Sequence, residues 1–166
     1  MARFDTRGGT GAWLEISMTV NGKVRKGNVD PRVLLVHFLR EQLRLTGTHI
    51  GCDTTQCGAC TVLVDGRSAK SLHDLRGSGR RIDRSRRSRA SRPTVRLHPL
   101  QEGFWEEHGL QCGYCTPGMI MAAVTLLKDN PKPSEREIRE GISGNFCRCT
   151  GYQHIVNAIQ YAANKG

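Results

Sequence analysis

All seven cysteines of this 166-residue chain fall into three short groups, and this grouping limits the fold more than any other feature. One group is a loop of three cysteines, and the other two are close pairs. An odd number of cysteines, with no export signal ahead of them, argues against a disulfide framework and for metal ligation. We therefore predict a chain that folds around metal centres. The groups are Cys52, Cys57 and Cys60; Cys112 and Cys115; and Cys147 and Cys149.

Each of the two pairs is followed by a threonine and then by a segment with helical spacing. Thr116 is predicted to cap one helix, with Pro117 at its first position, where the missing N–H costs nothing. Thr150 takes the same place after Cys149. Helix starts offer free N–H groups and partial positive charge, which stabilise thiolates and an anionic cluster. We expect the four sulfurs to converge on one centre, for which zinc and iron–sulfur both remain open.

The loop group favours iron–sulfur. Cys52, Cys57 and Cys60 have the C-x4-C-x2-C spacing of plant-type 2Fe–2S proteins, which zinc sites seldom use within one loop. A plant-type site needs a fourth cysteine further along the chain. None occurs between Cys60 and Cys112, so the sequence predicts a plant-type site with one ligand unaccounted for.

Residues 13–71 have the parts of a β-grasp, ferredoxin-like domain. Apolar and polar residues alternate from Leu14 to Val20, which predicts a half-buried strand. Asn21-Gly22 then predicts a hairpin turn into a returning strand. Asp30 is expected to cap a helix that begins at the next residue, a proline. After the cysteine loop, Thr61–Val64 is predicted to form a strand that turns into a second hairpin.

Residues 100–163 are predicted to form a small four-helix bundle, so that the fold class is α+β. Helices are expected after Pro99 and after the first cysteine pair. Ser134 and Glu137 form a capping-box pattern for the next helix, and the last is expected at about residues 154–163. Each domain buries little apolar surface, so each is expected to depend on its metal centre for stability.

Residues 72–99 carry most of the net charge of +10 and show no period, which indicates a basic linker. The range holds nine arginines against two aspartates. It has no aromatic residue to stack on a base, so we expect no nucleic-acid partner despite the charge. The sequence has no apolar run long enough for a membrane span. We expect a cytoplasmic protein, with attachment at the inner face of the membrane as an alternative.

Three motifs together resemble the iron–sulfur module of molybdenum hydroxylases, the family that includes xanthine dehydrogenase and aldehyde oxidoreductase. They lie at Gly51–Cys60, Gln111–Gly118 and Cys147–Tyr152. The resemblance covers roughly residues 13–71 and 100–163. The segments Val33–Glu41, Met119–Met121 and Ala158–Ala163 look closest to the small subunit of aerobic carbon monoxide dehydrogenase.

The resemblance implies an electron-transfer subunit with two 2Fe–2S clusters and no catalytic residue of its own. A large partner subunit would hold a molybdenum–pterin cofactor and a medium one FAD, in a dimer of heterotrimers. Electrons would pass from molybdenum through the two clusters to FAD. The expected activity is oxidation of carbon monoxide with water to carbon dioxide, two electrons and two protons. The alternatives are a small subunit for aldehyde, xanthine or N-heterocycle oxidation, or a free ferredoxin-like carrier.

The resemblance also implies which residues bind the clusters. One cluster takes the four cysteines of the two pairs, and it lies nearest molybdenum in the family. The plant-type cluster takes the three loop cysteines, and its fourth ligand falls at the position of Leu72. The ligand set is therefore Cys52, Cys57, Cys60, Cys112, Cys115, Cys147 and Cys149.

The leucine at position 72 also suggests an error in the reading frame. Codons CTG-CAC-GAT for Leu72 to Asp74, read one nucleotide later, give Cys-Thr. A GC-rich gene read out of frame also yields many arginines, as residues 72–98 have. We therefore predict that residues 72–98 are translated in a shifted frame. The rival interpretation is a true basic linker beside an incomplete cluster.

Overall fold

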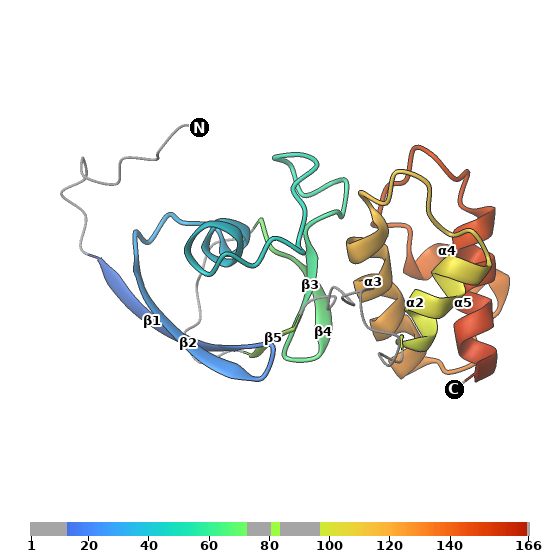
Figure 1. Cartoon of the computed structure of the whole chain (residues 1–166), viewed down its shortest axis with the longest axis horizontal. Helices are drawn as coiled ribbons and strands as arrows, with labels where there is room; N and C mark the ends of the chain where they lie inside the picture. Colours follow the sequence, from blue (N-terminus) through green and yellow to red (C-terminus); the bar gives the residue numbers. More distant parts are fainter. Residues whose placement is uncertain (1–12, 73–80, 84–96, 166) are drawn as a thin grey trace.

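The chain forms two domains side by side, a β-sheet domain and a helical domain (Figure 1). This computed structural model describes residues 13–72, 81–83 and 97–165. Each domain has its own apolar core: one between the sheet and a short helical segment, the other among four helices. The predicted α+β class is confirmed.

The N-terminal sheet has five strands in the order β2-β1-β5-β3-β4. β1 and β2 form the hairpin predicted at Asn21-Gly22, and both residues have the positive φ that this turn requires. β3 and β4 form the second predicted hairpin. The strands are β1 (Leu14–Val20), β2 (Lys23–Val29), β3 (Thr61–Val64), β4 (Arg67–Lys70) and β5 (Arg81–Asp83).

β5 corrects the expectation that residues 72–99 lack regular structure. It pairs in parallel with β1 and antiparallel with β3, so it lies at the centre of the sheet. Ile82 is buried in the domain core, and its carbonyl accepts a hydrogen bond from Asn21 N at 2.9 Å. The predicted linker residues 73–80 and 84–96 lie outside the described residues.

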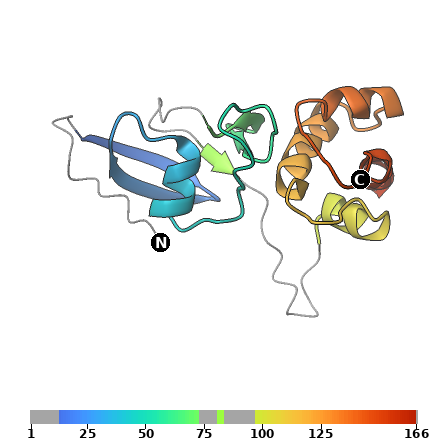
Figure 2. The same cartoon turned by 90° about the horizontal axis from the view of Figure 1, so that it is seen from above.

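One face of the sheet is covered by a short helical segment, α1 (Leu35–His37) continued by the π-helix η1 (Phe38–Gln42) (Figure 2). The predicted start of this helix at Pro31 is wrong by four residues. Asp30 accepts hydrogen bonds from the backbone and guanidinium of Arg32 and so closes a turn instead. Phe38 is fully buried against Gly27 of β2, where a Cβ would come within 2.8 Å of the ring.

The C-terminal domain consists of four helices, as predicted. Ser134 and Glu137 form the predicted capping box at the start of α4, and His98 forms a second one at α2. The helices are α2 (Pro99–Glu106), α3 (Thr116–Asp129), α4 (Glu135–Gly141) and α5 (Gln153–Lys165). Within the described residues, no helix is both long and apolar enough to cross a membrane.

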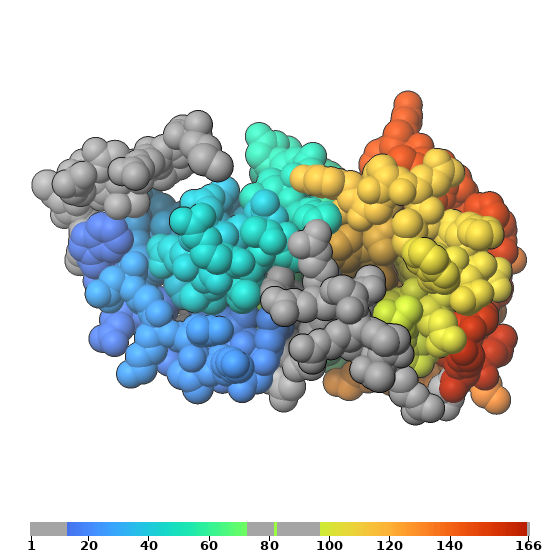
Figure 3. All heavy atoms as spheres, viewed as in Figure 1, coloured from blue at the N-terminus to red at the C-terminus, as the bar shows by residue number. Residues whose placement is uncertain are grey.

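The two domains meet along α3 and the outer hairpin of the sheet. Leu63 of β3 packs against the helical core. Gly118 of α3 lies so close to the cysteine loop that a Cβ would come within 2.3 Å of Gly58 O. In the space-filling view the loop and the start of α3 touch at the middle of the molecule (Figure 3). The junction therefore lies beside the cysteine groups of both domains.

Candidate metal centres

The four cysteines of the helical domain form two thiol pairs. The sulfurs of Cys112 and Cys149 are 3.5 Å apart and exposed. Cys115 and Cys147 share a second thiol–thiol hydrogen bond further inside, where Cys147 is buried. Among the described residues no three His, Cys, Asp or Glu side chains converge to hold a single metal ion. Two pairs suit two irons, each held by two thiolates, better than one tetrahedral zinc ion.

The helix starts beside these pairs differ from the prediction. Cys115, not Thr116, is the N-cap residue of α3, so Pro117 is the second residue of the helix rather than the predicted first. α5 begins at Gln153 rather than directly after Thr150. The Thr150 hydroxyl instead accepts from Tyr152 N and lies 3.2 Å from the Cys147 sulfur. Only α3 therefore starts directly at a ligand.

The pKa values of the two inner thiols, Cys115 and Cys147, are shifted in opposite directions. Burial raises the pKa of Cys115 to about 12. Burial also acts to raise the pKa of Cys147, but hydrogen bonds from Thr150 and the backbone of Cys149 outweigh it and lower the pKa overall. Cluster assembly must deprotonate both, so metal binding here releases protons.

Two of the three loop cysteines are in contact, because Cys57 N donates to the Cys52 sulfur at 3.4 Å. Hydrogen bonds from the backbone and thiol of Cys57 lower the pKa of Cys52 to about 6, whereas burial raises that of Cys57. Cys60 is fully buried at the start of β3. Arg40 of η1 positions the chain entering this loop, because its guanidinium donates to the carbonyls of Thr46 and Thr48.

Leu72 directly follows a residue that is hydrogen-bonded to Cys60. Ser71, fully buried, donates its backbone N–H and its hydroxyl to Cys60 O, at 3.2 and 2.7 Å. Leu72 follows directly, in a turn at the end of β4. Leu72, the position that the family resemblance assigns to the fourth ligand, is thus the neighbour in sequence of a residue that is hydrogen-bonded to Cys60.

The helical site also offers a hydrogen-bond donor suited to a cluster. The hydroxyl of Thr116, directly after Cys115, is buried and has no hydrogen-bond partner in the described structure. A buried hydroxyl without a partner is costly, and a cluster sulfide beside Cys115 would satisfy it. The donor set of this domain therefore fits a 2Fe–2S cluster, while the loop supplies three thiolates of four.

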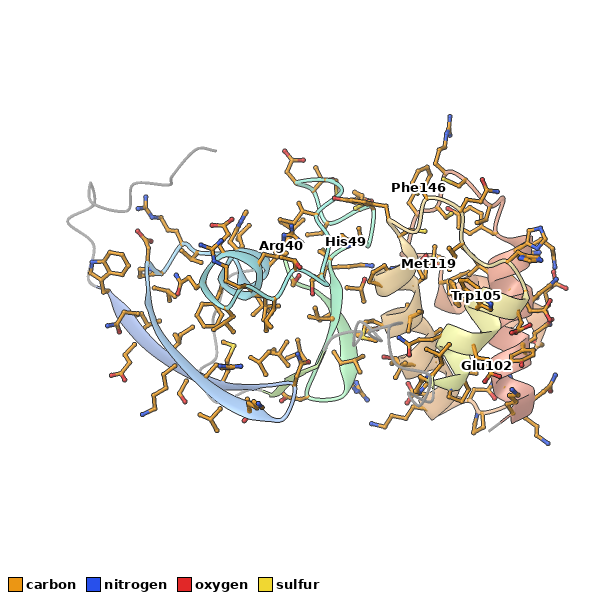
Figure 4. The ribbon with its side chains drawn as sticks, in the orientation of Figure 1. Arg40, His49, Glu102, Trp105, Met119 and Phe146 are labelled. Carbon is orange, nitrogen blue, oxygen red and sulfur yellow. The ribbon has the colours of Figure 1, made fainter. Side chains whose placement is uncertain are left out.

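The two sites are joined across the domain junction. Phe146 N donates to Cys57 O at 2.8 Å, and Phe146 precedes Cys147. Tyr114, which lies between Cys112 and Cys115, donates its hydroxyl to Ile50 O at 2.6 Å. Its ring stacks on His49 with centroids 4.7 Å apart. His49 and Phe146 lie on the two sides of this junction (Figure 4).

Sequence reasoning missed these junction residues. Most of the contacts use backbone carbonyls, which carry no signature in the sequence. The one available signal was position: Tyr114 and Phe146 lie inside or beside the cysteine motifs yet are aromatic and half exposed.

Comparisons with known proteins agree with the geometry. The model of the 2Fe–2S iron–sulfur cluster binding domain matches residues 18–85, and that of the 2Fe–2S binding domain matches residues 87–160. The gamma subunit of caffeine dehydrogenase from Pseudomonas sp. strain CBB1 is 49% identical over 150 residues, covering 87% of this chain and 88% of that subunit. The nicotine 6-hydroxylase small subunit of Paenarthrobacter nicotinovorans is 46% identical over 146 residues, with 88% and 87% coverage.

A solved structure shows the same arrangement. Quinoline 2-oxidoreductase from Pseudomonas putida 86 superimposes with a TM-score of 0.83 at 42% identity, over 92% of this chain and 94% of the matched one. The fold and the paired thiols thus define a protein with two 2Fe–2S domains.

The chain belongs to the iron–sulfur small subunits of the molybdenum hydroxylase family. It is the electron-transfer subunit of an oxidoreductase, with FAD and molybdenum–pterin carried by partner subunits. The predicted family and cofactors are thereby confirmed.

Proposed function

We propose that this subunit takes electrons at the exposed pair Cys112/Cys149 and passes them inward to the loop domain, for the oxidation of an N-heterocyclic substrate on a partner subunit. The seven cysteines hold the clusters, each of which accepts and gives up one electron when bound. The chain's own residues fix the sites and keep them close together.

The observation that carries this direction is the unequal exposure of the two thiol pairs. Cys112 and Cys149 lie at the surface, where a partner cofactor has access. Cys115 and Cys147 lie inside, and Cys147 is one residue from the hydrogen bond between Phe146 N and Cys57 O. The outer pair therefore suits exchange with the molybdenum subunit and the inner pair exchange with the second cluster.

The proposed substrate class comes from the relatives. Caffeine, nicotine and quinoline, the compounds in the names of three similar proteins, are all N-heterocycles. Carbon monoxide, the substrate first expected from the sequence, has no such support, and its oxidation remains an untested prediction. We also propose the partner arrangement of the family, a dimer of heterotrimers in the cytoplasm.

Anaerobic bleaching of the purified complex tests the substrate. A purine, a pyridine, quinoline, an aldehyde and carbon monoxide are added separately, and loss of visible 2Fe–2S absorption is followed. We expect bleaching with at least one N-heterocycle and none with carbon monoxide. Bleaching by carbon monoxide alone, or by the aldehyde alone, would overturn the assignment.

The proposed entry of electrons at the outer pair Cys112/Cys149 is tested by following cluster reduction in the whole complex. Cys149→Ser is expected to abolish reduction of the loop cluster by substrate while leaving its direct reduction by dithionite intact. Loop-cluster reduction by substrate at the normal rate in that variant would contradict the proposed direction.

A further inference from the structure

Lys70, the last residue of β4, reaches across the domain junction. Its ammonium donates to Gly144 O at 2.6 Å, to Thr61 Oγ1 at 3.1 Å and to Asn145 Oδ1 at 3.1 Å. An ammonium has three donors, and all three are used here. Two of the three acceptors belong to the helical domain, so Lys70 binds more of that domain than of its own.

The segment that Lys70 holds leads directly into a cluster ligand. Asn145 is buried, and its amide donates back to Gly58 O at 2.9 Å and to Thr61 Oγ1 at 3.2 Å. The next residue, Phe146, donates to Cys57 O. Three successive residues before Cys147 are therefore fixed by the sheet domain.

The segment from Gly144 to Phe146 has no helix or strand of its own domain to hold it. It lies between the end of α4 at Gly141 and the start of α5 at Gln153, outside any helix or strand. Within the helical domain, Asn145 N donates to Ile142 O, which closes a turn after α4. Cys147 N donates to the Tyr152 hydroxyl at 2.9 Å. The direction of the chain at Cys147 is thus set by this bond on one side and by the bonds that cross the junction on the other.

The three contacts of Lys70 suit a charged donor that holds a neighbouring segment in place. Hydrogen bonds from a charged donor are stronger than neutral ones, and the acceptors of Lys70 are all neutral oxygens. Lys70 forms no salt bridge with a carboxylate of the described residues, and its charge also interacts with the thiols of Cys52, Cys57 and Cys60.

We propose that Lys70 is a positioning residue for Cys147: from the loop-cluster domain, it sets the geometry of the other cluster. The inference rests on the proposed role of Cys147 as a ligand. It makes the helical cluster dependent on the sheet domain, although every ligand of that cluster lies in the helical domain.

The test compares Lys70→Met with Lys26→Met in the full chain within its complex. Lys26 lies exposed on the edge strand β2, away from the junction. Lys26→Met therefore removes the same charge without changing a junction contact. The first readout is the EPR spectrum of the helical-domain cluster, identified as the signal that is lost in Cys112→Ser. The second is the hydrogen exchange rate of the Phe146 amide. A merely stabilising role would leave the EPR spectrum of folded protein unchanged.

We expect Lys70→Met to change the g-values of that cluster and to speed Phe146 exchange at least about tenfold, equivalent to about 1.4 kcal/mol. Lys26→Met should match the wild type in both. Wild-type spectra and exchange in Lys70→Met would overturn the proposal; if this variant does not fold, Lys70→Gln replaces it under the same criteria. A wild-type protein without 2Fe–2S signals would refute the proposed function, while Phe146 exchange would still decide the role of Lys70.

Discussion

Replacing Gly118 by alanine should weaken the molecule at its domain junction. A Cβ at this position would lie 2.3 Å from Gly58 O and 3.2 Å from the Cα of Ala59. Both are backbone atoms, so no rotamer change relieves the contact, and α3 or the cysteine loop has to move. Overpacking of this kind costs about 1–3 kcal/mol.

Helix propensity acts in the opposite direction. Gly118 is the third residue of α3, and alanine in a helix is favoured over glycine by at most about 1 kcal/mol. We therefore expect a net loss of about 1–2 kcal/mol in the free energy of unfolding. For a chain of this size the loss lowers the melting temperature by about 2–8 °C.

The matched control is Gly141→Ala at the end of α4. Its Cβ would meet the tip of Leu126, with Cδ2 at 2.9 Å, and that flexible side chain can turn away. Calorimetry of the two variants should show a loss for Gly118→Ala and none for Gly141→Ala. Phe146 exchange should rise in the first alone. Equal melting temperatures and equal exchange in the two variants would refute the reasoning.

Three further predictions concern the cysteines. If residues 72–98 are a true basic linker, Leu72→Cys should raise iron from about two to about four atoms per chain. About four irons in the unmodified chain, with a cysteine-containing tryptic peptide from residues 68–105, would contradict this and support the frame-shift hypothesis. Cys112→Ser should lose the helical-domain cluster and much of the helix content of residues 100–163, measured by circular dichroism; native helix content would contradict it. In the iron-free chain, iodoacetamide should modify Cys52 increasingly as pH rises through about 6, because its lowered pKa makes it a thiolate there. Cys115, whose pKa is raised to about 12, should remain unmodified. Equal labelling of the two cysteines, measured by mass spectrometry, would argue against both shifts.

Local signals made most of the fold predictable. The Asn21-Gly22 turn and the alternation in β1 encode the first hairpin within a few residues, and the Ser134 capping box does the same for α4. The helix after Asp30 was misplaced because the carboxylate has a competing partner, Arg32, two residues on. Local competition of this kind decides helix ends, and the cap pattern alone does not reveal its outcome.

The site was predictable in its ligands and not in its supports. Metal ligation needs particular residue types at particular spacings, so the sequence shows it directly. Lys70 and Asn145 act through backbone oxygens of the opposite domain, 74 and 87 residues away, and nothing in the residue types reveals that pairing. β5 was missed for a similar reason: three residues with a single buried apolar side chain become a strand only through their neighbours.

The central place of β5 has a consequence for biosynthesis. β1–β2 and β3–β4 are local hairpins that form as soon as each pair of strands has left the ribosome, but in this strand order neither hairpin bonds to the other. Within the described residues, β5 alone joins them by strand pairing, with two residue pairs on each side. The sheet therefore stays open until residue 83 has left the ribosome, and a chain halted before that point has an unpaired strand edge on each hairpin. Chaperone binding to stalled chains should consequently fall sharply once β5 has left the ribosome and can pair with both hairpins.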